Sequence, residues 1–354
     1  MKTYSTGKQI GGVIIVVFVA CLIIVALYFS AGPGKQVELD SGHRMVMGTF
    51  ARVVVIAKDS DAAGKCIESA FTQINKVDDL MSDYKSDSEI SRVNRDGFKK
   101  AVQLSQSTYE VLQRSIEFGK LTDGAFDVTV GPLVELFRKA KSEQVLPNQD
   151  EIADARSKVG FEKLKLDGQN STVQFTVEGM RLDLGGIAKG YAVDKAVETM
   201  QNRGAIGGMV DLGGDIRCFG APLKGRDHWV IGLQNPNMGK DSAGREVLLK
   251  LKMTNGAIAT SGDYQQFIII EGKRHSHIIN RKTGTSIEGI SSVTIIADNA
   301  TNTDALATAV SVMGSESGLE LIENIPGTEA ILITSQPDFK LIKTSGAEKY
   351  IKKR

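Results

Sequence analysis

The chain has 354 residues, of which 42% are hydrophobic and 24% are charged, the composition of an ordinary globular protein. Its formal net charge of +1, with acidic and basic residues interspersed, argues against a nucleic-acid-binding protein, which would present a basic excess to phosphates. The four histidines and three cysteines show neither C-x-x-C nor H-E-x-x-H spacing, so the sequence predicts no zinc site.

Residues 11–30 are predicted to form a membrane-spanning helix. No charged residue occurs between Lys8 and Lys35, and the segment 13–29 is almost wholly apolar. A helix needs about 20 apolar residues to cross the hydrocarbon layer of a bilayer, and this segment is close to that length. The sequence therefore predicts a membrane anchor at the N-terminus.

The basic residues of the N-terminal tail predict how this helix is oriented. Lys2 and Lys8 precede it, so the positive-inside rule places residues 1–10 in the cytoplasm. The rest of the chain then lies on the periplasmic side of the inner membrane. Two alternatives stay open at this stage: a cleaved signal peptide, whose apolar region is usually shorter at about 7–15 residues, and lipidation at Cys21.

After the anchor, residues 31–42 read as a polar linker and residues 43–354 as one domain. A Val-rich alternating pattern predicts a strand over 45–57, and apolar residues at helical spacing predict a helix over 59–81. A second helix is expected to open at Ser105. The remaining expected elements are helices at 188–200 and 302–313 and strands at 173–177, 209–212, 216–219, 229–233, 249–253, 266–270, 293–297 and 330–333.

Strands and helices do not alternate regularly along the chain, which favours an α+β fold over a doubly wound parallel sheet. Cys66 and Cys218 could form a disulfide outside the cytoplasm, and the sequence does not decide whether they do.

Residues 183–191 combine a strand end, a glycine pair and a helix start. Backbone can approach a phosphate at such a place, and the helix N-terminus with Lys189 would favour its negative charge. The stretch is not a Walker A loop, because Tyr191 stands where that motif has lysine. The alternative interpretation is a glycine-rich turn in which Asp183 caps the turn and Lys189 is solvated.

Asp304 and Thr308 lie four residues apart on a predicted helix, so they share one face of it. A carboxylate and a hydroxyl directed the same way suit an oxygen-coordinated cation such as Mg²⁺. The alternative is an N-capping turn, with Thr308 bonding back to its own helix.

Three further stretches carry polar or aromatic candidates. Residues 124–132 are bounded by glycine and Gly-Pro, and could equally be a tight connection into a helix. His277 precedes a turn, where a histidine is also common as a hydrogen-bonded structural group. Tyr84 could stack on a flat ring, although a buried aromatic is the ordinary expectation.

Each of these motifs is weak alone, but their order and content together resemble the ApbE-like family of FAD:protein FMN transferases. The resemblance covers roughly residues 43–335. This chain departs from the family pattern after His277, where it has Asn280-Arg281 in place of the usual Asp-Pro. The matching stretches are Met-Gly-Thr at 47–49, Ser-Asp-Tyr at 82–84, residues 88–94, Gly-Ala-Phe-Asp-Val-Thr at 124–129, Asp-Leu-Gly-Gly-Ile-Ala-Lys-Gly at 183–190, residues 210–215, residues 259–264, the His277 segment and the Asp304 helix.

The resemblance implies a two-subdomain α+β enzyme that moves the FMN half of FAD to a Thr or Ser hydroxyl of an acceptor flavoprotein and releases AMP. It implies Mg²⁺ on the main-chain oxygen of Ala188 and the side chains of Asp304 and Thr308, with His277 and Lys189 as catalytic residues. The residues expected around the FAD are Met47, Tyr84, Ala125, Phe126, Asp127, Asp183, Lys189 and His277.

On the periplasmic side, the expected acceptor is a flavoprotein of a membrane respiratory or electron-transfer complex. Two other functions are compatible with the same residues. One is an FAD pyrophosphatase that gives free FMN and AMP, and the other is a flavin-binding protein without catalysis.

Overall fold

The computed structural model describes residues 36–353, apart from 224, 237–246, 263–266, 271 and 336–338. The predicted cytoplasmic tail and membrane-spanning segment lie outside the described residues, and so does the end of the 259–264 motif. Within the described part of the chain, no helix is long and apolar enough to cross a membrane.

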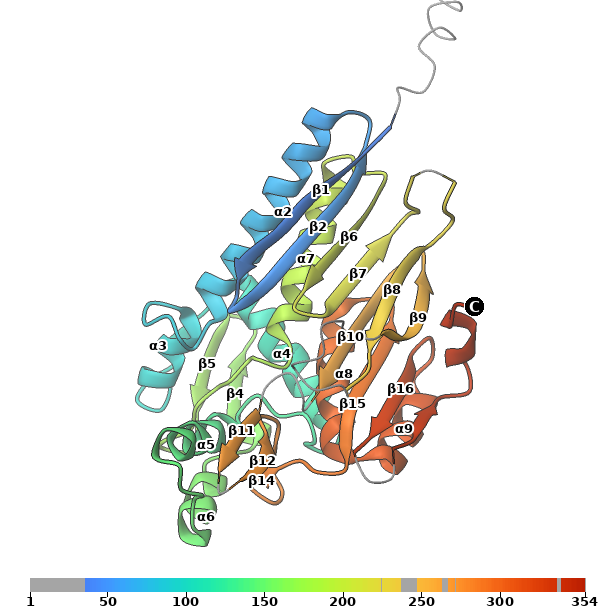
Figure 1. The fold of residues 1–354 in the computed structure, drawn as a ribbon. Coiled ribbons are helices and arrows are strands. Elements are labelled where there is room, and N and C mark those ends of the chain that lie inside the picture. Colours follow the sequence, from blue (N-terminus) through green and yellow to red (C-terminus); the bar gives the residue numbers. More distant parts are fainter. Residues whose placement is uncertain are drawn as a thin grey trace, which may run out of the picture.

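The largest element of the fold is an eight-stranded sheet in which every pair of neighbouring strands is antiparallel (Figure 1). Together with the helices, this sheet confirms the predicted α+β class. In spatial order the strands are β1 (Val37–Val46), β2 (Thr49–Ala57), β6 (Gly207–Leu212), β7 (Asp215–Phe219), β10 (Gly256–Gly262), β15 (Ile290–Ala297), β16 (Glu329–Thr334) and β17 (Leu341–Lys343).

The first two strands form a hairpin where the sequence predicted one strand over 45–57. The turn falls at Met47 and Gly48, which both have positive φ angles, 50° and 69°. Residues 37–40, expected to belong to the linker, pair with β2 instead. They gave no strand pattern because β1 is an edge strand with most of its side chains exposed, so it carries charged residues in place of a buried apolar row.

Four helices cover one face of the sheet: α2 (Ser60–Met81), α7 (Ala188–Asn202), α8 (Ala300–Met313) and α9 (Ser315–Glu323). α8 lies directly against β10 and β15, with alanines at buried positions that let helix and sheet approach closely. The hairpin of β8 (Trp229–Gln234) and β9 (Val247–Met253) packs on the opposite face.

Cys66 and Cys218 are both free and buried, so the possible disulfide is not formed. Cys66 belongs to the core on the helix side of the sheet and Cys218 to the core on the hairpin side. Burial raises the pKa of each thiol.

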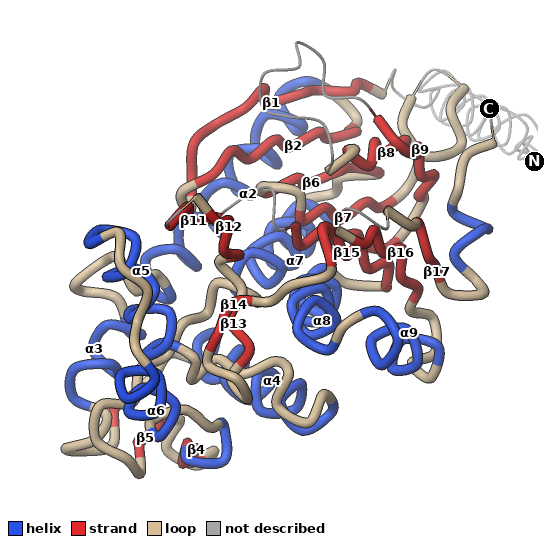
Figure 2. The backbone as a smooth tube through the Cα atoms, turned by 60° about the horizontal axis from the view of Figure 1, so that its bottom comes forward, coloured by secondary structure: helices blue, strands red, loops and turns tan. Residues whose placement is uncertain are grey.

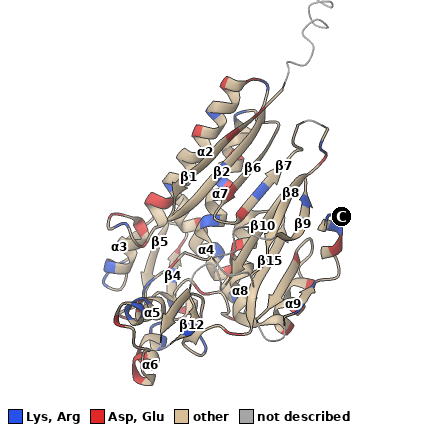
Figure 3. Ribbon diagram, viewed as in Figure 1, with Lys and Arg blue, Asp and Glu red and all other residues tan. Residues whose placement is uncertain are grey.

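A second, smaller group of elements lies at one end of the sheet (Figures 1 and 2). Lys and Arg are interspersed with Asp and Glu along the elements of both groups (Figure 3). The smaller group consists of α3 (Glu89–Asp96), α4 (Gln106–Leu121), α5 (Gly131–Glu143), α6 (Gln149–Ser157), a sheet of β3 (Val102–Gln103), β5 (Thr172–Phe175) and β4 (Leu164–Asp167), and the hairpins β11 (Phe267–Ile270) with β12 (Lys273–Ser276) and β13 (Ile279–Asn280) with β14 (Thr285–Ser286).

Candidate active site

A cleft of about 1710 Å³ is lined by residues of both groups. It exceeds the roughly 300–1,000 Å³ of sites for drug-sized ligands, so its volume is sufficient for a dinucleotide. Every site residue predicted from the sequence lines this cleft. They are Met47, Tyr84, Ala125, Phe126, Asp127, Asp183, Ala188, Lys189, His277, Asp304 and Thr308.

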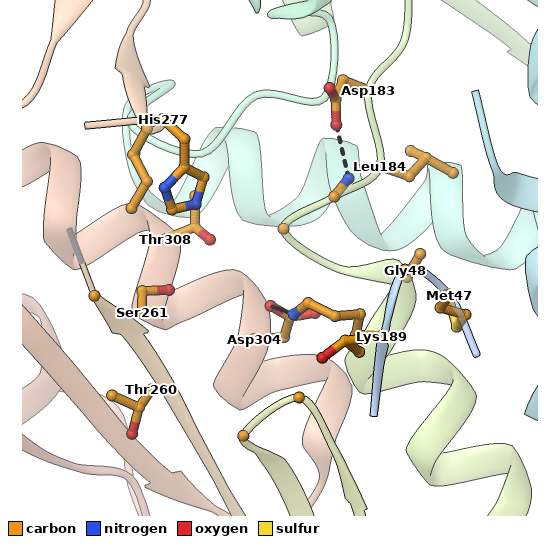
Figure 4. A pocket seen from close by; sticks show the side chains of 18 of the residues that line it. Met47, Gly48, Asp183, Leu184, Lys189, Thr260, Ser261, His277, Asp304 and Thr308 are labelled. Carbon is orange, nitrogen blue, oxygen red and sulfur yellow. Dashed lines mark hydrogen bonds and ion pairs between the residues drawn. The ribbon is translucent and has the colours of Figure 1, made fainter. Parts of the chain in front are cut away.

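The centre of the cleft holds a lysine between two buried carboxylates. Lys189 Nζ lies 3.3 Å from Asp304 Oδ1 and also forms an ion pair with Asp215. The backbone N–H of Gly190 donates to Asp304 Oδ2 at 3.0 Å. Figure 4 shows Lys189 and Asp304 in the middle of the cleft, and the two ion pairs of Lys189 exclude the alternative interpretation in which it is only solvated.

Burial and neighbouring charges together shift the pKa values of Asp215 and Lys189. Burial and the neighbouring charge of Asp304 raise the pKa of Asp215 to about 7, against the opposing effect of Lys189. Burial alone would lower the pKa of Lys189, but the charges of Asp215 and Asp304 raise it above its usual value. Lys189 therefore stays protonated at neutral pH.

Asp215 was not among the predicted site residues, although it ends the 210–215 motif. The signal that could have revealed it is a carboxylate directly after a glycine pair that closes a hairpin. That position brings its side chain back toward α7, where Lys189 lies.

The loop before α7 is shaped by short side chains. Asp183 accepts a hydrogen bond from the N–H of Gly185 at 2.8 Å, which confirms that it caps the turn. A Cβ on Gly186 would lie 2.9 Å from Thr308 Oγ1, so glycine keeps the space beside that hydroxyl open. α7 then begins at Ala188, where the sequence predicted its start.

Thr308 and Asp304 are not part of a helix cap. Asn299 is the N-cap of α8, and Asp304 lies more than one turn inside the helix. The Thr308 hydroxyl makes no hydrogen bond to any described residue, whereas Ser311 on the same helix bonds back to the Ala307 carbonyl at 2.7 Å. The capping interpretation is therefore wrong, and both side chains line the cleft.

Ala188, Asp304 and Thr308 lie on two adjacent helices and offer a main-chain oxygen, a carboxylate and a hydroxyl, which are the donor types that a hard cation takes. Within the described part of the chain, no cluster of three or more His, Cys, Asp or Glu side chains has metal-binding geometry. A cation here would therefore be held by one carboxylate and neutral oxygens. Mg²⁺ is bound in this way at phosphate sites, where waters and the substrate supply the other ligands.

Tyr84 projects from the wall of the cleft and is 79% exposed, so the expectation of a buried aromatic is wrong. The guanidinium of Arg138 lies 4.7 Å from the centre of its ring. Arg138 is held by Asp83 at 2.8 Å and by Asp183 at 3.2 Å. The position of the tyrosine ring is thus fixed from one side while most of its surface stays open.

The segment 125–127 lines the cleft, but two of its side chains support the protein itself. Phe126 is buried and packs edge-on against Phe118, with ring centres 5.9 Å apart. Asp127 accepts hydrogen bonds from Thr129, at 2.6 Å from the hydroxyl and 2.8 Å from the N–H, and pairs with Arg281.

Asn280 and Arg281, where the sequence departs from the expected Asp-Pro after His277, both make contacts that hold the turn. Asn280 accepts a hydrogen bond from the N–H of Lys282 at 2.8 Å, an Asx turn that an aspartate could also make. Arg281 forms an ion pair with Asp127, which ties this turn to the 125–127 segment, and both residues line the cleft.

His277 lies just before this turn and lines the cleft. Figure 4 shows its ring pointing into the cleft, with Thr308 on the same side and Met47 on the far side of Lys189. The cleft thus brings an imidazole, an ammonium and oxygen donors together from segments far apart in the sequence.

The sequence model of the ApbE family matches residues 47–332, four fifths of the chain. The chain belongs to the ApbE family. The match begins at Met47 and includes every predicted site residue as well as Asp215.

Individual members of the ApbE family resemble this chain over most of its length. The FAD:protein FMN transferase of Vibrio cholerae is 32% identical over 325 residues, 91% of this chain and 94% of that protein. The one from Treponema pallidum is 30% identical over 331 residues, 90% of each chain.

Solved structures of the family share the fold. The ApbE protein of Thermotoga maritima superposes with a TM-score of 0.79 at 30% identity, over 90% of this chain and all of that one. The flavin transferase ApbE of Vibrio cholerae gives a TM-score of 0.75 at 31% identity, with the same coverage.

Proposed function

We propose that this protein is an FAD:protein FMN transferase, which moves the FMN half of FAD to a Thr or Ser hydroxyl of an acceptor flavoprotein and releases AMP. One observation carries the proposal. A cleft of dinucleotide size places Lys189, the oxygen donors of Asp304 and Thr308, and His277 around one centre. The names of the curated relatives support the same activity.

FAD has a flat ring system and a pyrophosphate, and the cleft offers groups for both. The exposed ring of Tyr84, fixed by Arg138, is suited to stack on a flat ring. The positive end of α7 and the Lys189 ammonium face the cleft, which favours a pyrophosphate, although the N–H groups of Ala188 and Gly190 are already bonded to the Leu184 carbonyl and to Asp304. Met47 and Asp183 also line the cleft.

Mg²⁺ would be held by the main-chain oxygen of Ala188 and the side chains of Asp304 and Thr308. The space that Gly186 leaves beside the Thr308 hydroxyl supports this placement. When bound, the ion would neutralise pyrophosphate charge and polarise the phosphorus toward attack.

The transfer itself needs a base and a group that balances charge. A hydroxyl is a weak nucleophile at neutral pH, so His277 would take its proton as the oxygen attacks the phosphorus of the FMN half. The new P–O bond forms as the bond to the AMP phosphate breaks. Lys189 would balance the charge that develops on the departing AMP.

The predicted anchor at residues 11–30 would place this cleft on the periplasmic side of the inner membrane. Acceptors on that side would be flavoproteins of membrane respiratory or electron-transfer complexes. An anchored enzyme and a membrane-bound acceptor would lie at the same membrane surface, so the predicted anchor supports the predicted class of acceptor.

The test is to incubate the full-length chain with FAD, Mg²⁺ and a candidate acceptor, and to measure the acceptor mass and AMP release. An FMN adduct that depends on the acceptor supports transfer. Rapid release of free FMN and AMP without any acceptor would identify a pyrophosphatase. Bound FAD that stays intact in every mixture would identify a flavin-binding protein.

A further inference from the structure

Asp194 lies on α7 behind the cleft, and its carboxylate is bonded to two other elements. Its side chain is 8% exposed, and it is not one of the residues that line the cleft. Oδ1 accepts from the N–H of Ala300 at 2.9 Å and from Arg217 Nη1 at 2.8 Å. Oδ2 accepts from the N–H and the hydroxyl of Thr301 at 2.9 and 2.6 Å. A carboxylate has about four acceptor sites, so this one is fully used.

These bonds join the three elements that carry the central groups of the cleft. Lys189 is on α7 with Asp194, Asp215 is the first residue of β7, and Asp304 is on α8. The two N–H groups that Asp194 accepts from are the first two of α8. Asp304 follows one turn later, about 5 Å along the helix axis.

The contact between α7 and α8 leaves little freedom for either helix to shift. A Cβ on Gly190 would lie only 2.2 Å from the carbonyl oxygen of Ala300. The Gly190 N–H also donates to Asp304 Oδ2. Any movement of the start of α8 therefore moves the Asp304 carboxylate relative to Lys189.

The charge and both oxygens of Asp194 matter for this arrangement. A buried negative charge at a helix N-terminus is stabilised by the helix dipole, and Arg217 compensates it from β7. Asparagine has the same size, but one of its two polar atoms is an NH₂ group. That NH₂ donor would then face another donor, either a backbone N–H of α8 or the Arg217 guanidinium, and no hydrogen bond could form between them.

We propose that Asp194 is a positioning residue for the cation site. By fixing the start of α8 against α7 and β7, it holds Asp304 in place for binding a divalent cation together with Ala188 and Thr308. This inference rests on the proposed function, in which those three residues hold Mg²⁺.

The chain offers a control that separates positioning from simple helix capping. Asn299 caps the same helix, since its side chain accepts from the N–H of Asn302 at 2.9 Å, but that bond stays within α8 and its cap. Asn299→Ala therefore weakens α8 without loosening its bonds to α7 and β7.

The experiment titrates Mg²⁺ calorimetrically into the full-length, FAD-free chain and records thermal midpoints for the parent, Asp194→Asn, Thr301→Val and Asn299→Ala. Asp194→Asn is expected to weaken Mg²⁺ binding at least about tenfold, the usual effect of removing a partner of a metal ligand. Thr301→Val, which loses only the hydroxyl bond, should weaken it by a smaller factor. Asn299→Ala should lower the midpoint and leave Mg²⁺ affinity unchanged.

Equal Mg²⁺ affinity in Asp194→Asn and the parent would overturn the inference, and so would an equal loss in Asn299→Ala. If Asp194→Asn does not fold, Thr301→Val decides: parent-like affinity there refutes the positioning role. A parent that binds no Mg²⁺ would instead contradict the metal site of the proposed function, and the inference with it.

Discussion

Gly190→Ala is the substitution whose effect follows most directly from the packing of the cleft. The added Cβ would meet the Ala300 carbonyl oxygen at 2.2 Å and the Asp304 Cβ at 2.9 Å. Non-bonded carbon atoms are most stable about 3.5–4.0 Å apart. The first of these contacts is with backbone, which cannot rotate away as a side chain could, so α7 and α8 must separate.

Inserting a methyl group into a close-packed contact costs typically about 1–3 kcal/mol. Replacing glycine inside a helix returns roughly 0.5–1 kcal/mol, which is an upper bound for Gly190 because it is the third residue of α7. The difference is roughly 0–2.5 kcal/mol, and because the added Cβ meets backbone we expect the upper part of that range, about 1–2.5 kcal/mol, or a fall of about 2–8 °C in thermal midpoint. Because the separation displaces Asp304, Mg²⁺-dependent FMN transfer should fall more than this loss of stability explains.

The assay compares thermal midpoints and transfer rates at 25 °C, where both proteins are folded. Gly64→Ala is the matched control, because Gly64 lies inside α2 and a Cβ there meets nothing within 4 Å. That variant should be as stable as the parent or more so, with unchanged transfer. If Gly190→Ala behaves like Gly64→Ala, the close contact of α7 and α8 is not what shapes the site.

Three further predictions concern single side chains. His277→Ala should bind FAD but lose about 10²–10⁴-fold in transfer rate, measured by the FMN adduct over time; an unchanged rate would remove histidine from the mechanism. The raised pKa of Asp215, about 7, means that the folded chain holds a proton that the unfolded chain has released, so metal-free stability should fall as pH rises from 5 to 8. Asp215→Asn should flatten that trend in urea unfolding, and an unaltered slope would contradict it. Arg281→Met leaves buried Asp127 without its ion pair and should lower the free energy of unfolding by about 3 kcal/mol. Lys282→Met removes only an exposed ion pair and should change that free energy by nothing measurable. Equal effects of the two substitutions would refute a stabilising role for the Arg281–Asp127 pair.

Spacing and local motifs predicted α2, α7 and α8, whereas α5, which carries Arg138 on the cleft wall, was not predicted. Apolar spacing predicted α2, and the structure shows Asp59 capping it as its first turn requires. The start of α7 and the body of α8 were predicted within two residues. Because Asp304 and Thr308 are four apart on one helix, local geometry alone placed them on one face.

Other elements carry too little local signal to be predicted. β10 is made of small residues and lies buried at the centre of the sheet, so neither alternation nor bulk marks it. The edge strand β1 is recognisable only through its pairing with β2. The ion pairs of Asp215 and Arg281 depend on segments distant in the sequence, and no local pattern contains that information.

The most direct test of the account is the mass of an acceptor flavoprotein after incubation with the full-length chain, FAD and Mg²⁺. The account predicts that the acceptor gains one FMN on a Thr or Ser, that one AMP is released per adduct, and that Asp304→Ala abolishes both. AMP and free FMN released at the same rate without acceptor, or an adduct that forms as well with Asp304→Ala, would contradict it.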